Sequence, residues 1–439
     1  MKIFSFILLF LINLLYAGDP NSYFSVTGKD HVINSLSEKI LITKTYNLTK
    51  PQKVLVISNG TFAPYNKNGI AKVYIKIDGD SSIGNLSIIN WKDSEIPMPH
   101  SFDCIATTNL TAGRHTISLI ATVDKTTPDS NFKILKNTGL SILLDPAPYV
   151  ISNNDSSKST VIDTQPQRFK GFYPVAMNEI LTNSFDVGSK STNVVTLASG
   201  SATLNKGFGD ALWGILLNNE NCLDNDTSQW SVNDLYKGAE LTAPMFLHSF
   251  HNLIGQNKLK LKGGKLTFDY FDNTVSYKVD NSVQLITLYG MELSGKASIS
   301  SAKCNREDWG FFGTSDKMNK TITPVNDKHE VLKTDLTIPK NHNGVILFLT
   351  KMRIQPGIED LGGTAELWIN IDGNDVGTIG MQGFKHHSSA SSRTISASYL
   401  SSGKMSLKPG SHTVRVYLRA QGDFKQIAHS LDLPLIYFD

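Results

Sequence analysis

The sequence predicts an all-β protein made of three tandem β-sandwich modules with a jelly-roll-like arrangement. Apolar and polar residues alternate with a period of two in many short stretches, turn residues separate these stretches, and a long segment recurs near the C-terminus. Only residues 233–254 carry a moderate helical pattern, and Pro244 interrupts it. Many short strands joined by glycine-rich turns are typical of two-sheet sandwiches.

The chain opens with the pattern of a secretory signal peptide. Lys2 precedes an apolar run from Ile3 to Tyr16, and small residues follow at Ala17. The run is shorter than the roughly 20 residues that a membrane-spanning helix needs. We therefore expect a signal peptide over residues 1–17, a secreted or cell-surface protein, and no membrane span.

An internal repeat defines the first and third modules. The matched segments are 68–80 with 362–374 and 110–119 with 407–416. Both copies then close on a short apolar strand that ends in aspartate, at Asp145 and Asp439. Because several matched segments keep almost the same offset, chance is a poor explanation of the similarity.

A weaker copy lies between the two. Its strand 211–217 is similar to the one that ends at Asp372, and 261–270 keeps the later frame, with Leu266 where the outer copies have His115 and His412. The predicted modules and linkers are module 1 over 18–146, a diverged module 2 over 168–294, module 3 over 328–439, and linkers at 146–167 and 295–327.

Alternation and turn chemistry predict the strands inside each copy. Val73, Ile75 and Ile77, for example, occupy every second position, so one face of that strand packs a core and the other meets solvent or a second layer. The predicted turns are Asn59-Gly60, Asp78-Gly79, Ala112-Gly113, Gly263-Gly264, Asp372-Gly373 and Pro409-Gly410.

Charge and cysteine content exclude several classes of protein. The 42 Lys+Arg and 39 Asp+Glu give a net charge of +3 without a block of like charges, which argues against a nucleic-acid partner. The 3 cysteines cannot form a disulfide scaffold. Cys222 and Cys304 are free to pair in an oxidising compartment, and Cys104 is interpreted as a buried structural thiol.

No catalytic constellation is found in the sequence. It has no Gly-x-Ser-x-Gly, His-Glu-x-x-His or phosphate-binding loop, and adjacent carboxylates such as Glu307-Asp308 rarely meet across a substrate. His115 and His412 occupy equivalent positions, and we interpret both as hydrogen-bonded to a neighbouring strand.

Aromatic residues are the positive candidates for a binding site. Trp91, Trp230 and Trp309 stand among polar or turn residues, as an aromatic platform that stacks on a sugar ring would require. The alternative for each is that its indole anchors a loop to the sandwich. Trp213 and Trp368 lie instead in predicted strands.

A strand ending in Asp-Gly, the frame Leu-x-x-Gly-x-His-Thr and a closing apolar strand resemble the galactose-binding-like jelly rolls, which include many carbohydrate-binding modules of secreted glycosidases. The resemblance implies a glycan ligand. It also implies a structural calcium held by carboxylates of first and last strands, here Glu38 with Asp145 and Glu330 with Asp439. The alternative is that these acids are solvated strand ends. No other cofactor is expected.

The sequence therefore favours a secreted or cell-surface, non-catalytic protein that binds a glycan or another cell-surface ligand. Two alternatives stay open: a glycan-directed hydrolase with its active site in the second module, and a structural adhesion protein that self-assembles as a homo-oligomer.

Overall fold

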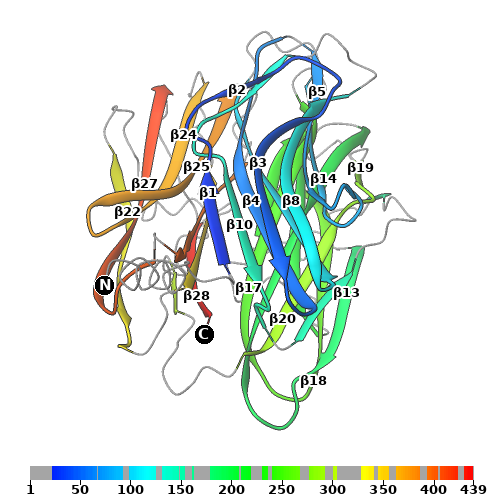
Figure 1. Ribbon diagram of the computed structural model, residues 1–439. Helices are drawn as coiled ribbons and strands as arrows, with labels where there is room; N and C mark the ends of the chain where they lie inside the picture. The colour runs from blue at the N-terminus through cyan, green and yellow to red at the C-terminus, as the bar shows by residue number, and fades with distance from the viewer. Residues whose placement is uncertain are drawn as a thin grey trace, which may run out of the picture.

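We describe the fold from a computed structural model of the chain. It describes all residues except 1–21, 67, 92–97, 125–130, 148, 154–160, 163–177, 207–208, 219–229, 236–239, 267–275, 292–299, 304–327, 341–344, 355–361, 386–392, 404–405, 424–429 and 439. The described residues form antiparallel strands and turns without any α-helix, which confirms the predicted all-β class of sandwich modules (Figure 1). The predicted signal peptide lies outside these residues.

Module 1 is a sandwich of two sheets. One sheet has β1 and β2 along its edge, then β10 and β9, then β4 and β7, and the other has the order β6-β5-β8-β3. The strands are β1 (Ser22–Val26), β2 (His31–Ile33), β3 (Lys39–Leu48), β4 (Gln52–Pro64), β5 (Gly69–Ile77), β6 (Leu86–Trp91), β7 (His100–Leu110), β8 (Gly113–Val123), β9 (Phe132–Ile134) and β10 (Gly139–Leu144).

Module 2 repeats this plan. Its sheets are β11-β20-β14-β17, with β19 and β12 beside β14, and β13-β18-β15-β16. The strands are β11 (Tyr149–Asn153), β12 (Val161–Ile162), β13 (Asn178–Asp186), β14 (Thr192–Lys206), β15 (Gly209–Leu217), β16 (Trp230–Leu235), β17 (Glu240–Leu253), β18 (Gln256–Leu266), β19 (Ser276–Val279) and β20 (Gln284–Met291).

Module 3 has the same two layers. Its sheets are β22-β27-β24-β25 and β26-β23-β28-β21. The strands are β21 (Ser300–Lys303), β22 (His329–Ile338), β23 (Val345–Ile354), β24 (Gly362–Ile371), β25 (Asn374–Lys385), β26 (Arg393–Ser401), β27 (Gly410–Asp423) and β28 (Ser430–Phe438).

Strands occur inside both predicted linkers, so the linker prediction is wrong for these residues. β11 and β12 pair with β20 and β19 of module 2, and β21 pairs with β28 of module 3. They occupy the same sheet edge that β1 and β2 occupy in module 1. These strands have only 5, 2 and 4 residues, and the polar residues around them resemble linkers in the sequence.

Backbone irregularities recur at matching positions of the three modules. The corresponding strands β3, β13 and β22 each contain a register shift near their first residues. The shifts lie between Ile40 and Ile42, between Glu179 and Leu181, and between Glu330 and Leu332. Asp78 and Asp372 begin the predicted Asp-Gly turns with φ of 52° and 51°, and Asn218 takes their place in module 2 with φ of 53°. The repeat is therefore expressed in the backbone as well as in the sequence.

Two predicted turns and the predicted alignment of module 2 need correction. Gly263-Gly264 lies within β18 and Asn59-Gly60 within β4, so neither is a turn. The pairing of Leu217 with Leu259 shows that Gly255, with φ of 70°, corresponds to Gly113 and Gly410. Asn257, and not Leu266, thus stands where the outer modules have histidine. The helical pattern of 233–254 belongs to β16 and β17, where tertiary pairing overrides local periodicity.

The three modules join one another in a cyclic order. β6 of module 1 pairs with β17 of module 2, and β16 of module 2 pairs with β26 of module 3. β25 of module 3 reaches module 1, where the Gly383 N–H donates to the Pro99 carbonyl at 2.7 Å, just before β7. Because β6, β16 and β25 correspond, as do β7, β17 and β26, each module uses the same edge toward the next. The described strands form a closed pseudo-threefold ring.

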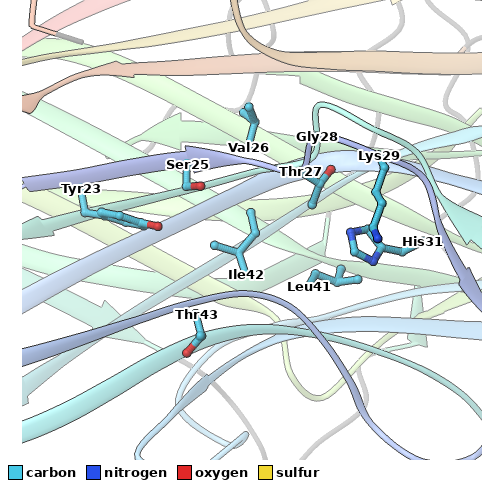
Figure 2. A pocket seen from close by; sticks show the side chains of 10 residues that line it. All are labelled: Tyr23, Ser25, Val26, Thr27, Gly28, Lys29, His31, Leu41, Ile42 and Thr43. Carbon is cyan, nitrogen blue, oxygen red and sulfur yellow. The ribbon is translucent and has the colours of Figure 1, made fainter. Parts of the chain in front are cut away.

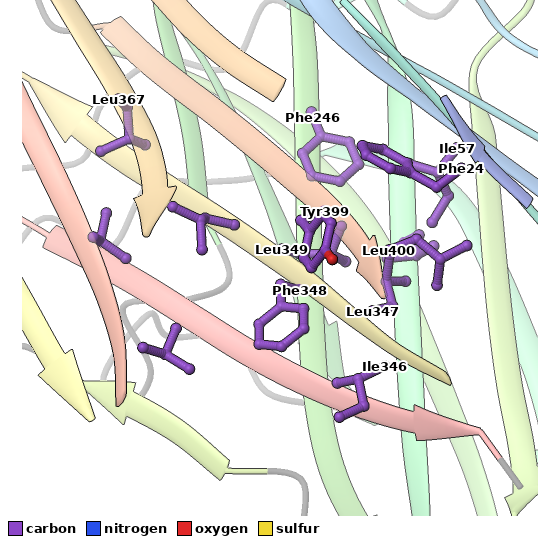
Figure 3. Packing of buried hydrophobic residues seen from close by; sticks show 14 of the residues in the cluster. Phe24, Ile57, Phe246, Ile346, Leu347, Phe348, Leu349, Leu367, Tyr399 and Leu400 are labelled. Carbon is purple, nitrogen blue, oxygen red and sulfur yellow. The ribbon is translucent and has the colours of Figure 1, made fainter. Parts of the chain in front are cut away.

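A shared apolar core lies between the modules, in addition to the cores within modules 1 and 2. Corresponding residues of β4, β14 and β23 contribute to it: Leu55, Val195 and Ile346, and Ile57, Leu197 and Phe348. Figure 3 shows Ile57 and Phe24 of module 1 and Phe246 of module 2 beside the module 3 residues Phe348 and Tyr399. The Phe24 and Tyr399 rings meet edge to face, with centroids 5.4 Å apart. Packing between the modules explains why nearly every residue of β4 and β10 is buried, because both faces of these strands are covered.

Candidate binding site

A hollow of about 500 Å³ opens on module 1, where its two sheets separate (Figure 2). Its walls are residues of β1, the turn that follows β1, β2 and β3: Tyr23, Ser25, Val26, Thr27, Gly28, Lys29, His31, Leu41, Ile42 and Thr43. Sites for small ligands typically have volumes of about 300–1,000 Å³, so the hollow is large enough to hold a sugar ring.

Local chain geometry shapes this hollow. Residues alternate across β1, so Phe24 enters the shared core while Tyr23 and Ser25 face the hollow. After Val26 the edge strand leaves β10, and Thr27 holds the crossing: its N–H donates to the Thr138 carbonyl at 2.8 Å, and its Oγ1 accepts from the Thr138 N–H. The chain then rejoins the sheet as β2 beside β9.

The Tyr23 ring lies at one end, and two nitrogen-bearing side chains, Lys29 and His31, lie at the other end of the hollow. Figure 2 shows the Tyr23 hydroxyl directed along it, with Lys29 and His31 at the far end. The Lys44 ammonium lies 4.8 Å from the centre of the Tyr23 ring, within cation–π distance. Between these ends lie the hydroxyl groups of Ser25, Thr27 and Thr43. Thr27 Oγ1 already accepts from the Thr138 N–H and donates to the Leu135 carbonyl, and Thr43 Oγ1 lies 2.8 Å from the Ser118 hydroxyl. Ser25 therefore contributes a hydroxyl that can donate and accept hydrogen bonds with a ligand. The site thus combines the groups that contact the faces and the hydroxyls of sugars.

The charge around the hollow is positive. Burial lowers the pKa of His31, and the nearby Lys39 and Lys29 ammonium groups lower it further. None of the lining residues is acidic. Asp30 sits between Lys29 and His31 in the chain, but its carboxylate accepts from the Lys136 N–H at 3.0 Å and lies 3.9 Å from the Lys133 ammonium.

Module 2 carries a second aromatic feature on the corresponding edge strand. The Tyr149 ring, 56% exposed, stacks on Tyr289 with centroids 5.0 Å apart and an interplanar angle of 16°. Phe185 supports Tyr289 from a third strand, also at 5.0 Å. The pKa of Tyr289 is raised by burial, with smaller contributions from Tyr149 and the Asp186 carboxylate. Tyr149 is therefore an exposed aromatic ring held in place by Tyr289.

A third aromatic pair lies on β24 and β27 of module 3. Trp368 and Tyr417 are cross-strand partners with ring centroids 5.8 Å apart. The Arg419 guanidinium lies 5.9 Å from the Trp368 ring and also bonds Glu366. Trp368 is only 7% exposed, so this pair stabilises the sheet and offers little ring surface to a ligand.

The structure places the predicted tryptophans differently from the expected loop platform. Trp91 ends β6, is 2% exposed, and its indole N–H donates to the Asn66 carbonyl at 2.7 Å. Trp91 is thus an anchor in the module 1 core, and its assignment to a stacking platform is wrong. Trp230 begins β16 and pairs with Gly214. Trp309 lies outside the described residues.

The acids expected to hold calcium do not converge. Glu38 accepts from the Tyr74 hydroxyl at 2.7 Å and from Lys76 at 2.6 Å, just before β3. Asp145 accepts from the Gln52 amide and the Lys53 N–H, beyond the other end of β3. A strand of 10 residues is about 30 Å long, so the pairing of Glu38 with Asp145 is wrong.

The second predicted calcium pair is only partly described. The Glu330 carboxylate lies 3.0 Å from Arg415 Nε, and Asp439 is outside the described residues. Among the residues that the structure describes, no three His, Cys, Asp or Glu side chains gather as metal ligands would.

His115 and His412, which occupy equivalent positions of the repeat, make the same two contacts. His115 Nδ1 lies 2.6 Å from the Asp78 carboxylate and Nε2 lies 2.8 Å from the Thr111 carbonyl; His412 repeats both contacts with Asp372 and Lys408, at 2.6 and 2.7 Å. The interpretation of both histidines as partners of a neighbouring strand is confirmed.

Cys104 is buried without a disulfide, and burial raises its pKa to about 12, as expected of a structural thiol. Cys222 and Cys304 lie outside the described residues. No described helix is long and apolar enough to cross a bilayer.

Sequence reasoning missed the hollow because its residues carry no motif. Ser22–Val26 is a short strand that directly follows the expected signal peptide, and Tyr23 has no neighbour in the sequence that marks it as functional. The tertiary pairing of β1 with β10, and the approach of β3, create the site.

Comparison with known proteins gives only distant structural likenesses. No family model and no curated protein matches the chain. The chain is similar to the CBM22-1–CBM22-2 tandem domain from Paenibacillus barcinonensis Xyn10C (10% identity, 66% of this chain and 98% of that chain, TM-score 0.20). It is also similar to the ANXUR2 extracellular domain from Arabidopsis thaliana (9%, 62% and 90%, 0.20) and to PNGF-II (8%, 87% and 98%, 0.26). These TM-scores carry no inference about function.

Proposed function

We propose that the protein is a secreted or cell-surface, non-catalytic binding protein that recognises glycans, and that the hollow of module 1 holds a sugar ring. The observation that carries the proposal is the lining of this hollow, in which the Tyr23 ring, the Ser25 hydroxyl and two nitrogen-bearing side chains surround a volume of about 500 Å³. A sugar presents C–H faces to aromatic rings and hydroxyls to polar side chains, so each group has a matching counterpart.

The module 2 platform supports the same class of ligand from a second position. Tyr149 offers an exposed ring already held in place by Tyr289. A preordered aromatic ring loses little conformational entropy when a ligand stacks on it. The hollow remains the better candidate, because side chains of β1, β2 and β3 line it together whereas Tyr149 offers a single ring face.

A glycan array probed with the purified protein tests the proposal, with Tyr23→Ala and Tyr149→Ala as matched aromatic variants. We expect binding to a subset of glycans, and a loss of about tenfold for Tyr23→Ala, the size of a typical aromatic contact. Equal binding by Tyr23→Ala and loss by Tyr149→Ala would move the site to module 2.

Two further outcomes separate the alternative functions. Cleavage of a panel glycan by the protein alone would favour a hydrolase over a binding protein. Concentration-dependent assembly in analytical ultracentrifugation, together with an array on which no glycan binds, would favour a self-assembling structural protein.

A further inference from the structure

We propose that the hollow of module 1 selects anionic sugars, with Lys29 and His31 meeting a carboxylate or sulfate group while Tyr23 contacts the ring. This inference rests on the proposed glycan-binding function and adds the chemical class of the ligand. It follows from the charges of the hollow, which glycan binding in general does not require.

The first support is the one-sided charge of the site. Lys29 and His31 are the only ionisable side chains besides Tyr23 among the ten lining residues. Lys39 lies nearby and donates from its ammonium to the Val32 carbonyl at 3.0 Å, which fixes this charge beside β2. Because Lys29 is exposed, solvent and salt screen its charge, so its attraction for an anion should weaken as the ionic strength rises.

The second support is the disposition of the nearest acid. Asp30 is the residue between Lys29 and His31, and it is the natural partner for either. Its carboxylate is instead engaged by the Lys136 N–H and lies near the Lys133 ammonium. The Asp30 carboxylate therefore makes its hydrogen bond and its ion pair with residues that do not line the hollow.

The third support is the distance between the aromatic end and the cationic end. Figure 2 shows Tyr23 and the Lys29–His31 pair at opposite ends, with the Ser25 hydroxyl between them. A sugar that carries an acidic substituent has this same layout: an apolar ring face, hydroxyls, and a charge at its periphery. A neutral sugar would leave the cationic end without a partner.

The proposal also predicts a dependence on pH. Burial, Lys39 and Lys29 hold the His31 pKa below its ordinary value, while Asp30 raises it slightly, so the imidazole is largely neutral at pH 7.5. As the pH falls through this lowered pKa the imidazole gains a proton, whereas a sugar sulfate stays ionised. Affinity for an anionic sugar should therefore rise as the pH falls.

Calorimetric titration with three oligosaccharides of equal length tests the proposal: one neutral, one containing uronic acids and one sulfated. We expect the anionic ligands to bind at least about tenfold more tightly than the neutral one, and the difference to shrink in high salt. Lys29→Gln should reduce the affinity for the anionic ligands far more than that for the neutral one, and His31→Gln should remove the rise in affinity at low pH. The uronic and sulfated arms identify which anion is preferred.

Lys258→Gln is the matched control, because Lys258 is an exposed lysine on β18 of module 2. Unchanged affinity in this variant supports a defined site. Equal losses in Lys29→Gln and Lys258→Gln would mean diffuse attraction to surface charge and would overturn the inference. Equal affinity for neutral and anionic ligands would overturn it while leaving the glycan-binding function intact. No binding of any oligosaccharide would overturn both.

Discussion

Single residues explain why the repeat survives in the two outer modules. The Asp-Gly turn and the histidine-containing strand of the repeat are hydrogen-bonded to each other. Asp372 accepts from the His412 ring and from the Thr413 N–H at 2.8 Å. Asp78 makes the same contacts with His115 and Thr116. The left-handed conformation of the aspartate brings its carboxylate to the strand it joins, so a sequence motif records a tertiary contact.

Replacing Asp372 by Asn tests the contribution of the Asp372–His412 hydrogen bond to stability. Burial lowers the pKa of the His412 imidazole, but hydrogen bonds to the Lys408 carbonyl and the Asp372 carboxylate outweigh it and hold this pKa above its usual value. The hydrogen bond to His412 in turn holds the pKa of the Asp372 carboxyl below its usual value, despite opposing burial. A raised histidine pKa stabilises the fold below pH 6.5 and loses that effect as pH rises through the folded value; the lowered aspartate pKa loses its effect in acid.

We therefore expect Asp372→Asn to lower the free energy of unfolding by about 1 kcal/mol near pH 6, because the pair is solvent-screened. The deficit should shrink at pH 9, when the imidazole is neutral. Urea unfolding of both proteins at the two pH values measures it. A loss of unfolding free energy that grows with pH would contradict a stabilising pair between Asp372 and protonated His412.

A buried acid at the junction of modules 1 and 3 gives a second residue-scale prediction. Asp103 accepts from Asn59 Nδ2 at 2.7 Å and from the Ser396 hydroxyl at 2.5 Å, yet burial raises its pKa to about 7. Because this value exceeds the unfolded one, Asp103 destabilises the fold progressively as the pH rises from about 4 through 7.

Asp103→Asn removes this ionisation and keeps an amide in its place. Compared with the unchanged chain, the variant should gain melting temperature between pH 5 and pH 8. Asp30→Asn, at an exposed acid, serves as the control and should show no such gain. Parallel pH profiles of Asp103→Asn and the unchanged chain would show that the carboxyl does not titrate with folding.

At the scale of elements, the outer hairpins depend on glycine at one place. Gly113 and Gly410 begin β8 and β27 with φ of 134° and 136°, a region that side-chain-bearing residues rarely adopt. An added Cβ would meet no atom within 4 Å at either position, so the requirement for glycine is conformational and not steric.

Gly410→Val should accordingly destabilise the protein by about 1–3 kcal/mol. Gly28→Ala is the matched control, because Gly28 also has free space around it but no positive φ, and it should change stability little. Denaturant midpoints report both effects. Similar midpoints for Gly410→Val and the unchanged chain would mean that the backbone relaxes at no cost.

The elements also show how far the sequence leads. Period-two stretches such as Val73–Ile77 predict strands correctly because one face packs a core and the other is polar. The same reasoning fails for Gly263-Gly264, which lies inside β18, where the Tyr277 side chain packs against the glycine backbone. It also places Trp91 in a loop, although Trp91 ends β6 and pairs with β17. Sites made by pairing between distant segments, such as the hollow, leave no local signature.

At the scale of the whole molecule, three sandwiches behave as one folding unit. Their corresponding strands β4, β14 and β23 turn apolar faces toward a common core, so a module on its own would expose residues such as Leu55 and Ile57 to water. Uncovering such a surface is costly, which makes independent folding of module 1 unfavourable.

Two measurements test this unity. Phe348→Ala, at a fully buried position of the shared core, should cost about 3–5 kcal/mol and leave a single cooperative unfolding transition. A protease site engineered into residues 304–327 should, after cleavage, give fragments that elute together in gel filtration. Separate elution of folded fragments would show that the modules do not depend on the shared core.

The central claim is that module 1 binds a glycan in the hollow between β1, β2 and β3. Hydrogen–deuterium exchange of the protein, with and without its best array ligand, tests this claim most directly. We predict slower exchange in peptides covering residues 22–33 and 39–48, and little change in 149–153 and 284–291. Protection confined to the module 2 peptides, or absent from residues 22–48 while the ligand is bound, would contradict it.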